Sequence, residues 1–451
     1  GLVFRATIIA IASEKIILQL RAPQTNSVVF DTSPGRLWAI EKDFMDSAST
    51  SLFRGLFSFL SGSEHRREVL LNPSLSLVDE TQVLVLDHQD DERNMMVLKA
   101  KQARDFFLLV GPPGTGKTSF GLMSILREEL ASDVDCNVLL AAYTNRAVDE
   151  ICSKLAKDEN DFLRVGNKHN CDPLYHQYLL EHKVSQLSDV NKVGELIRST
   201  RILVGTVASL SGMTALLMRK RFSLAIVDEA SQLLEPHLLP LLMAGENEKL
   251  AIRRFVLIGD HKQLPAVVQQ TPQDSRVSEE ELKAIGLDDC RKSLFERLYH
   301  SVPKCCIHEF TKQGRMHPEP RVLFYTCTPS SDSDLLSVAS RKSCPKNSDT
   351  KTLQAGIPSA KLNLDEAQLI VHLAEHTYKE IQHRGVPFDL DKELGIIVPY
   401  RHQISMVRSL LQTSAYPVLA NVTIDTVERF QGSEKNVIIY GFTVSRPSQL
   451  S

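Results

Sequence analysis

The stretch Gly111-Pro112-Pro113-Gly114-Thr115-Gly116-Lys117-Thr118 fits the phosphate-binding loop pattern at every required position. An apolar run at 106–110 precedes it and predicts a buried strand, while residues 119–130 predict a helix. In that context the backbone N–H groups of the loop and the helix N-terminus bind phosphate. We expect Lys117 to contact the β- and γ-phosphates of ATP and Thr118 to bind Mg²⁺. Ser119 completes this nucleotide-binding stretch.

A second motif, an acidic pair, ends another apolar run. Asp228 and Glu229 follow residues 222–227, which predict a buried strand. We expect Asp228 to hold Mg²⁺, directly or through water, and Glu229 to accept a proton from the attacking water. An isolated acidic pair is usually a solvated turn, but on a second strand after a phosphate loop it predicts catalysis.

Composition places the chain among ordinary globular proteins. Its 451 residues predict two or more domains. A net charge of −3 argues against a basic coat for nucleic acid, although a local groove remains compatible with it. Eight cysteines without a Cys-x-x-Cys pair indicate reduced thiols in an intracellular protein. Apolar runs are all shorter than the roughly 18–20 residues of a membrane span. The chain begins with glycine, and we expect it to be a fragment.

The pattern of strands and helices predicts an α/β protein with three parts. Residues 91–303 alternate between the two, as in a mostly parallel sheet covered on both faces, with a helical insertion at about 170–200. Residues 1–90 predict a β-rich accessory domain with one or two helices, including strands at 28–30 and 83–86. Residues 304–451 predict a second α/β unit that starts with a strand at 305–310 and is truncated at its C-terminal end.

Polar motifs follow the predicted strands. In order along the chain they occupy residues 143–149, 205–206, 258–265, 313–318, 397–401 and 426–434. The carboxyl ends of parallel strands are where ligands bind in open α/β sheets. We therefore expect two such sheet edges to face each other across one nucleotide.

These motifs, in this order, resemble those of superfamily 1 helicases over residues 91–445. The branch concerned contains the nonsense-mediated-decay RNA helicase and the Okazaki-flap nuclease–helicase. The resemblance implies two tandem RecA-like P-loop domains and an N-terminal barrel-like accessory domain on a helical stalk. It also implies that Gln263 senses the γ-phosphate, that Arg315 is an arginine finger, and that Glu434 contacts the ribose. The residues implied near the nucleic-acid strand are Thr144, Asn145, Gly205, Thr206, Pro399, Tyr400, Thr426 and Gln431.

The function implied is an ATP-dependent helicase or translocase that moves 5′ to 3′ on single-stranded DNA. DNA is favoured over RNA, and a nuclease domain or loading partner is expected outside this chain. The alternatives are an RNA helicase, an ATP-dependent nucleic-acid clamp or remodeller, and a scaffold with a vestigial ATP site. Intact Lys117, Asp228 and Arg315 argue against the scaffold.

The chain departs from the family pattern in three features. Arg93 stands where the family has an adenine-reading glutamine, which leaves the preferred base open. Gly314 replaces the tyrosine that usually precedes the finger arginine. The final family motif, with a further phosphate-sensing arginine, is missing before Ser451, and we expect it to lie beyond this fragment.

Overall fold

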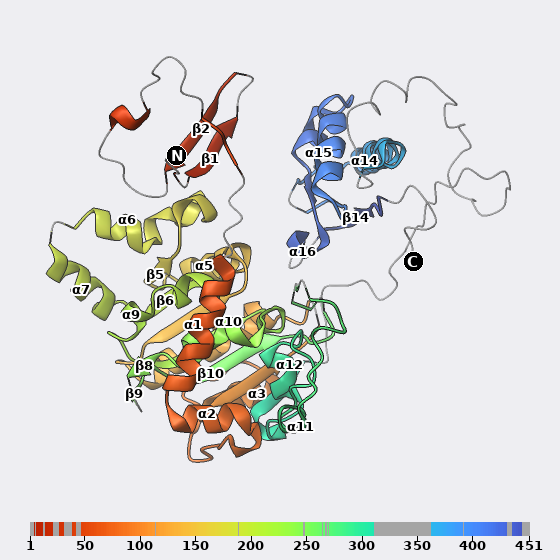
Figure 1. Ribbon diagram of the computed structural model, residues 1–451. Helices are drawn as coiled ribbons and strands as arrows, with labels where there is room; N and C mark the ends of the chain where they lie inside the picture. Colours follow the sequence, from red (N-terminus) through yellow and green to blue (C-terminus); the bar gives the residue numbers. More distant parts are fainter. Residues whose placement is uncertain are drawn as a thin grey trace.

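The computed structural model describes residues 4, 6–11, 14–20, 27–30, 38–41, 47–112, 114–187, 189–246, 249–263, 265–266, 268, 270–310, 362–390, 392–430 and 435–443. Within these ranges a seven-stranded parallel sheet forms the main body (Figure 1). Its strands lie in the spatial order β11 (Ile307–Glu309), β3 (Phe106–Val110), β10 (Ile252–Gly259), β7 (Phe222–Asp228), β4 (Val138–Ala142), β6 (Ile202–Thr206) and β5 (Phe162–Val165). The predicted α/β fold class is confirmed.

The register of this sheet brings the carboxyl ends of its strands to one edge. Ala142, the last residue of β4, pairs with Thr206 of β6 on one side and with Asp228 of β7 on the other. Gly259 of β10 pairs with Val110 of β3. Because neighbouring strands lie about 4.8 Å apart, the segments that follow them are adjacent. The sheet therefore gathers motifs that are far apart in the sequence.

Helices connect the strands and cover the sheet. They include α3 (Asp91–Gln102), α4 (Met123–Ser132), α5 (Asn145–Lys157), α6 (Leu180–Ser185), α7 (Val190–Ser199), α8 (Val207–Ser211), α9 (Thr214–Leu217), α10 (Glu235–Leu242), α11 (Glu280–Ala284) and α12 (Leu294–Tyr299). Strands β3, β4 and β6 are buried along their whole length, as in parallel sheets covered on both faces. In the described ranges, every helix is too short or too polar to span a bilayer.

A second, three-stranded parallel sheet has the order β13 (Thr423–Asp425), β12 (Leu394–Ile397) and β14 (Val437–Tyr440). It is accompanied by α14 (Leu364–His383), α15 (Arg401–Gln412) and the short α16 (Val427–Phe430). Its apolar core, which includes Ile370, Leu394, Val407 and Ile424, is separate from that of the first sheet. The chain therefore folds around two cores.

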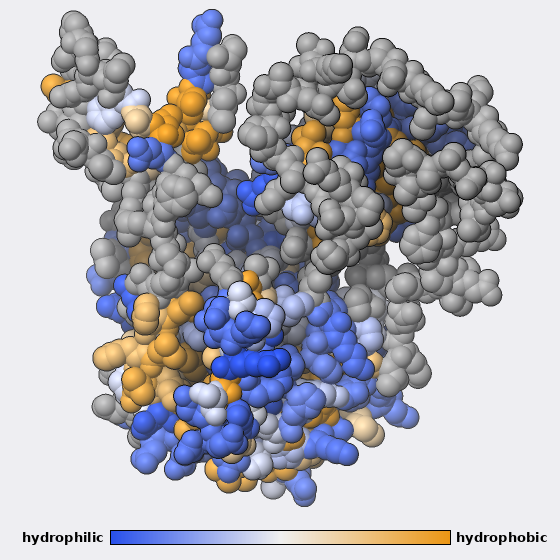
Figure 2. Space-filling view, turned by 45° about the vertical axis from the view of Figure 1, so that its right-hand side comes forward, coloured by the Kyte–Doolittle hydropathy of each residue, from blue (hydrophilic) through white to orange (hydrophobic). Residues whose placement is uncertain are grey.

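The described residues of the N-terminal part include an antiparallel hairpin and two α-helices. The hairpin joins β1 (Ala6–Ile11) to β2 (Ile16–Leu20), and the helices are α1 (Ser47–Ser61) and α2 (Glu64–Leu71). Helix α1 packs along α10 (Figure 1). Gly55 permits this close approach, since a Cβ there would lie 2.4 Å from the carbonyl oxygen of Pro236. The opposite face of α1 exposes Phe53, Phe57 and Leu60, and apolar surface is visible on the lower body in Figure 2.

Arg66 anchors α2 beneath the first sheet. The side chain is 1% exposed, and its guanidinium donates to the carbonyl oxygens of Ile252 (3.2 Å) and Arg253 (2.7 Å) at the start of β10. It also lies 5.5 Å from the ring centre of Phe106 and 5.2 Å from that of Phe255. Burial lowers its pKa to about 10, but the group stays charged at neutral pH. This contact holds the N-terminal helices at the end of the sheet opposite the phosphate loop.

Several predicted elements were wrong. Residues 28–30 belong to a 3₁₀ helix (Ser27–Phe30) rather than a strand. Residues 83–86 are not a strand, because the N–H groups of Val85 and Leu86 donate to a side chain instead of to a sheet. The strand at 305–310 does not open the second sheet, since β11 pairs with β3 at the edge of the first. Strand β5 was not predicted at all, and the tract at 328–360 lies outside the described residues.

We predict that Arg66→Ala lowers the free energy of unfolding of the first sheet by about 2–4 kcal/mol, because it leaves two buried carbonyl groups unpaired and opens a cavity. Urea denaturation followed by far-UV circular dichroism would measure the change. Arg54→Ala, at an exposed position of α1, is the matched control and should change the midpoint little. Equal effects of the two substitutions would contradict the anchoring role.

Candidate nucleotide-binding site

The phosphate loop joins the end of β3 to the π-helical turn η3 (Lys117–Leu122). Gly114 and Gly116 have φ angles of +81° and +82°, in the left-handed region that favours glycine. The Nζ of Lys117 donates to the carbonyl oxygens of Gly111 and Pro112, the second at 3.0 Å. The amine therefore lies against the loop itself, where a bound phosphate would be held.

Thr118 and Asp228 meet at this edge and fit a Mg²⁺ ion. The hydroxyl of Thr118 donates to Oδ2 of Asp228 at 2.7 Å. Asp228 is buried, and burial raises the pKa of its carboxyl group. Mg²⁺ in phosphate sites uses oxygen ligands, with one or two carboxylates supplemented by the phosphates and water. Among the described residues, no cluster of three or more His, Cys, Asp or Glu side chains would hold a metal alone.

Glu229 adopts a conformation that is rare for its residue type. Its φ angle is +55°, and its N–H donates to Oδ1 of Asp228 at 2.9 Å. Such strain in a side-chain-bearing residue is typical of functional sites. Burial and the neighbouring Asp228 raise the pKa of Glu229 to about 7. Its Oε2 atom is buried and accepts no hydrogen bond from the described part of the chain. The carboxylate is thus suited to take a proton near neutral pH.

The loop after β10 positions Gln263 next to this site. Asp260 accepts hydrogen bonds from the N–H of Lys262 (2.9 Å) and from Nε2 of Gln263 (3.2 Å). Gly111 of the phosphate loop donates its N–H to the carbonyl oxygen of Gly259 at 3.2 Å. These contacts join the predicted γ-phosphate sensor to the phosphate loop. The sensing role itself remains a prediction.

The residues of the first sheet that are predicted to contact nucleic acid lie on the same edge. Thr144 and Thr206 accept hydrogen bonds from N–H groups of α5 and α8, each at 3.1 Å, and therefore cap these helices. Asn145 begins α5 and is half-buried. Gly205 and Thr206 are buried. The two threonine hydroxyls thus have structural roles as caps, and contact with nucleic acid remains a prediction for all four residues.

In the second sheet, Pro399 and Tyr400 follow β12 and Thr426 follows β13. Ile397 of β12 pairs with Asp425 of β13, so these segments leave the sheet at one edge. All three predicted contact residues are half-buried. The parallel register therefore brings them together as predicted.

Four predicted site residues lie outside the described residues. They are Pro113, Arg315, Gln431 and Glu434. Their roles in binding nucleotide or nucleic acid remain predictions.

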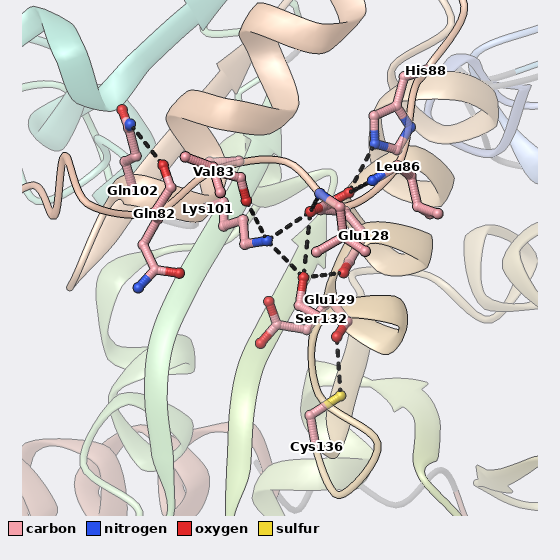
Figure 3. A network of polar contacts seen from close by, with 12 residues as sticks. Gln82, Val83, Leu86, His88, Lys101, Gln102, Glu128, Glu129, Ser132 and Cys136 are labelled. Atoms are coloured by element: carbon pink, nitrogen blue, oxygen red, sulfur yellow. Dashed lines mark hydrogen bonds and ion pairs between the residues drawn. The ribbon is translucent and has the colours of Figure 1, made fainter.

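A buried carboxylate fixes the segment that leads into α3 (Figure 3). Glu128 of α4 accepts hydrogen bonds from the N–H groups of Val85 (2.8 Å) and Leu86 (3.0 Å) and from Nζ of Lys101 (2.7 Å). His88 contacts the same carboxylate at 3.3 Å. Burial alone would raise the pKa of Glu128, but these hydrogen bonds and the charge of Lys101 lower it. The helix that follows the phosphate loop thereby determines where α3 begins.

Two aromatic residues at the loop were not predicted. The ring of Phe120 lies against Gly116, because a Cβ on that glycine would be 2.4 Å from the ring. Phe310, just after β11, donates its N–H to the carbonyl oxygen of Val110 at 2.8 Å and packs against Gly111. Phe120 is 47% exposed. From the sequence alone, an exposed phenylalanine at the start of a helix looks the same as one that packs in the core.

Known families and proteins match this chain over most of its length. Two families, each described as an AAA domain, match the chain, one over residues 87–200 and 189–271 and the other over residues 290–449. The chain is 28% identical to "DNA replication ATP-dependent helicase/nuclease JHS1" of Arabidopsis thaliana, over 91% of this chain and 30% of that protein.

Vertebrate proteins give similar matches. Identity is 30% to the chicken protein "DNA replication ATP-dependent helicase/nuclease DNA2" and 28% to its human counterpart, over 75% and 81% of this chain. The chain spans 31% and 35% of their lengths, or about a third. Among solved structures, "DUF1998 helicase MrfA bound to DNA" covers 76% of this chain and 43% of its own, at 9% identity and a TM-score of 0.36. That score is too low to support an argument.

We predict that Asp228→Asn removes the dependence of nucleotide binding on Mg²⁺. The amide keeps the shape of the side chain but loses the charge that attracts the cation, so ATP should bind with similar affinity in Mg²⁺ and in EDTA. Displacement of a fluorescent ATP analogue would measure both affinities. If Mg²⁺ still strengthened binding as in the unmodified chain, the proposed metal ligand would be wrong.

Proposed function

We propose that this chain, which belongs to the superfamily 1 helicases, hydrolyses ATP at the edge of its seven-stranded sheet and thereby moves along single-stranded nucleic acid. The observation that carries the proposal is the contact between Thr118 and Asp228, which unites the two nucleotide motifs. Mg²⁺ held there would neutralise charge on the transferred phosphate. Glu229 would accept the proton of the attacking water, and Lys117 would stabilise the γ-phosphate.

The connection to the second unit supports Arg315 as the finger. The chain leaves the first sheet at Phe310, whose N–H donates to the carbonyl oxygen of Val110 immediately before the phosphate loop. Arg315 follows five residues later, and a chain of five residues spans at most about 18 Å. A segment of that length could bring the guanidinium of Arg315 to a nucleotide on the loop. An arginine finger contributes roughly 10³–10⁵ in rate.

Movement along nucleic acid requires the affinity for the single strand to change as ATP is bound and hydrolysed. The residues predicted to contact the strand follow strands of both sheets, and ATP would bridge the two units through Lys117 and Arg315. Loss of the γ-phosphate removes that bridge and relaxes the closed state. We propose single-stranded DNA as the polymer and 5′ to 3′ as the direction, with a nuclease domain or loading partner outside this chain. The names of the matched proteins, all DNA replication helicase/nucleases, support DNA.

ATP turnover measured alone, with single-stranded DNA and with single-stranded RNA is the decisive experiment. We expect DNA to raise the rate at least tenfold and Lys117→Ala to abolish turnover. Unwinding of duplexes with a 5′ tail, but not a 3′ tail, would support the direction. Strand-stimulated turnover without unwinding of either substrate would indicate a clamp or remodeller, and turnover that neither polymer raises would contradict the helicase proposal.

We predict that Glu229→Gln reduces ATP turnover about 10²–10⁴-fold while leaving ATP affinity within a few-fold, because the amide cannot accept the proton of water. Steady-state turnover and displacement of a fluorescent ATP analogue would separate the two effects. Glu181→Gln, which removes the same charge from an exposed position of α6, is the control and should leave both values unchanged. A Glu229→Gln variant with normal turnover would require another base.

A further inference from the structure

An exposed aromatic ring and a guanidinium form a stacked pair beside the phosphate loop. The Cζ atom of Arg93 lies 4.2 Å from the ring centre of Phe120. Arg93 belongs to the first turn of α3, and Phe120 belongs to η3, two residues after Thr118. The ring is 47% exposed and the arginine side chain 29% exposed. Planar groups of both kinds stack on nucleobases.

The pair adjoins the position where phosphates bind. Phe120 donates its N–H to the carbonyl oxygen of Gly116 at 2.7 Å, and its ring covers that glycine. Gly116 lies inside the phosphate loop, immediately before Lys117. A nucleotide with its phosphates on this loop has its base a few ångströms away, beyond the ribose. The stacked pair is therefore placed to receive the base.

Both carboxylate oxygens of Asp90 hold Arg93 in this place. Asp90 caps α3 by accepting the N–H of Arg93 at 2.8 Å, and its other oxygen pairs with Nε of Arg93 at 2.9 Å. The preceding segment is fixed by Glu128 through the N–H groups of Val85 and Leu86. Asp90 engages the Nε atom of the guanidinium. The guanidinium is thus preoriented rather than freely mobile.

We propose that Arg93 and Phe120 form the base subsite of this nucleotide site and that the subsite accepts guanine at least as well as adenine. This inference rests on the proposed function, since it concerns the same nucleotide site. It assigns the base preference of that site to Arg93, whose guanidinium can donate hydrogen bonds but cannot accept them.

The hydrogen-bonding groups of the purines explain the expected preference. Guanine presents two acceptors, O6 and N7, which suit the parallel donors of a guanidinium. Adenine presents the N7 acceptor beside the N6 amino donor, and arginine has no acceptor for that amino group. A glutamine or asparagine amide, by contrast, pairs with both groups of adenine. Arg93 can therefore pair with both groups on the O6/N7 edge of guanine, but with only one group on the N6/N7 edge of adenine.

Competition binding tests the proposal without nucleic acid or turnover. ATP, GTP and CTP would each displace a fluorescent ATP analogue from the chain in Mg²⁺. We expect GTP to bind at least as tightly as ATP and both purines to bind more tightly than CTP. Arg93→Gln should shift the ratio about tenfold in favour of ATP, since a good bidentate pair discriminates bases by roughly that factor. Phe120→Ala should weaken both purines about tenfold through loss of stacking.

Arg104→Gln is the matched control, because Arg104 pairs with Asp79 at an exposed site at the other end of β3. It should leave the GTP-to-ATP ratio unchanged. The proposal is overturned if the unmodified chain binds ATP more tightly than GTP, or if Arg93→Gln leaves the ratio as it was. Binding of no nucleotide would overturn this inference and the proposed function together. Normal purine binding without strand-stimulated turnover would overturn only the proposed function.

Discussion

The hydrogen bond between Thr118 and Asp228 depends on the parallel alignment of all strands in the first sheet. Their strands, β3 and β7, are separated in the sheet by β10 and in the sequence by more than a hundred residues. Only a parallel register aligns their carboxyl ends, because an antiparallel strand would carry its following loop to the opposite edge. A one-residue slip would turn Asp228 toward the other face. The buried apolar strands therefore do more than stabilise the core, since their alignment determines the chemistry.

The features that the sequence predicts well are those that combine a local signal with a buried strand. The loop at 111–118 and the acidic pair at Asp228 and Glu229 end long apolar runs, and the structure brings them together. Secondary-structure predictions failed where a short apolar run has a hydrogen-bonding partner far away in the sequence, because the local pattern does not reveal that partner. Residues 83–86 look like a strand, but their N–H groups are taken by Glu128, more than forty residues later. The strand predicted at 305–310 is present only as β11 (Ile307–Glu309), and tertiary structure alone shows that it pairs with β3.

The same limit applies to side chains in the site. The sequence predicted that Thr144 and Thr206 contact nucleic acid, and the structure shows that their hydroxyls cap helices. Capping and nucleic-acid contact select the same residue types at the same place, because a loop that follows a strand both begins a helix and faces the ligand. Phe120 illustrates the converse. Its exposure depends on η3 and α3 packing side by side, and an aromatic residue in a first helical turn gives no sequence signal of that.

The two ends of the nucleotide should have separable functions. By proposal, the γ-phosphate end involves Lys117, Glu229 and Arg315, so a change there should alter both hydrolysis and closure. By proposal, the base end involves Arg93 of α3, Phe120 of η3 and the segment held by Glu128, all of which belong to the part of the chain around the first sheet. Closure of the second unit is not needed to form that subsite. Base preference can therefore change in this chain without altering the coupling between hydrolysis and strand movement, because the two properties rest on different contacts.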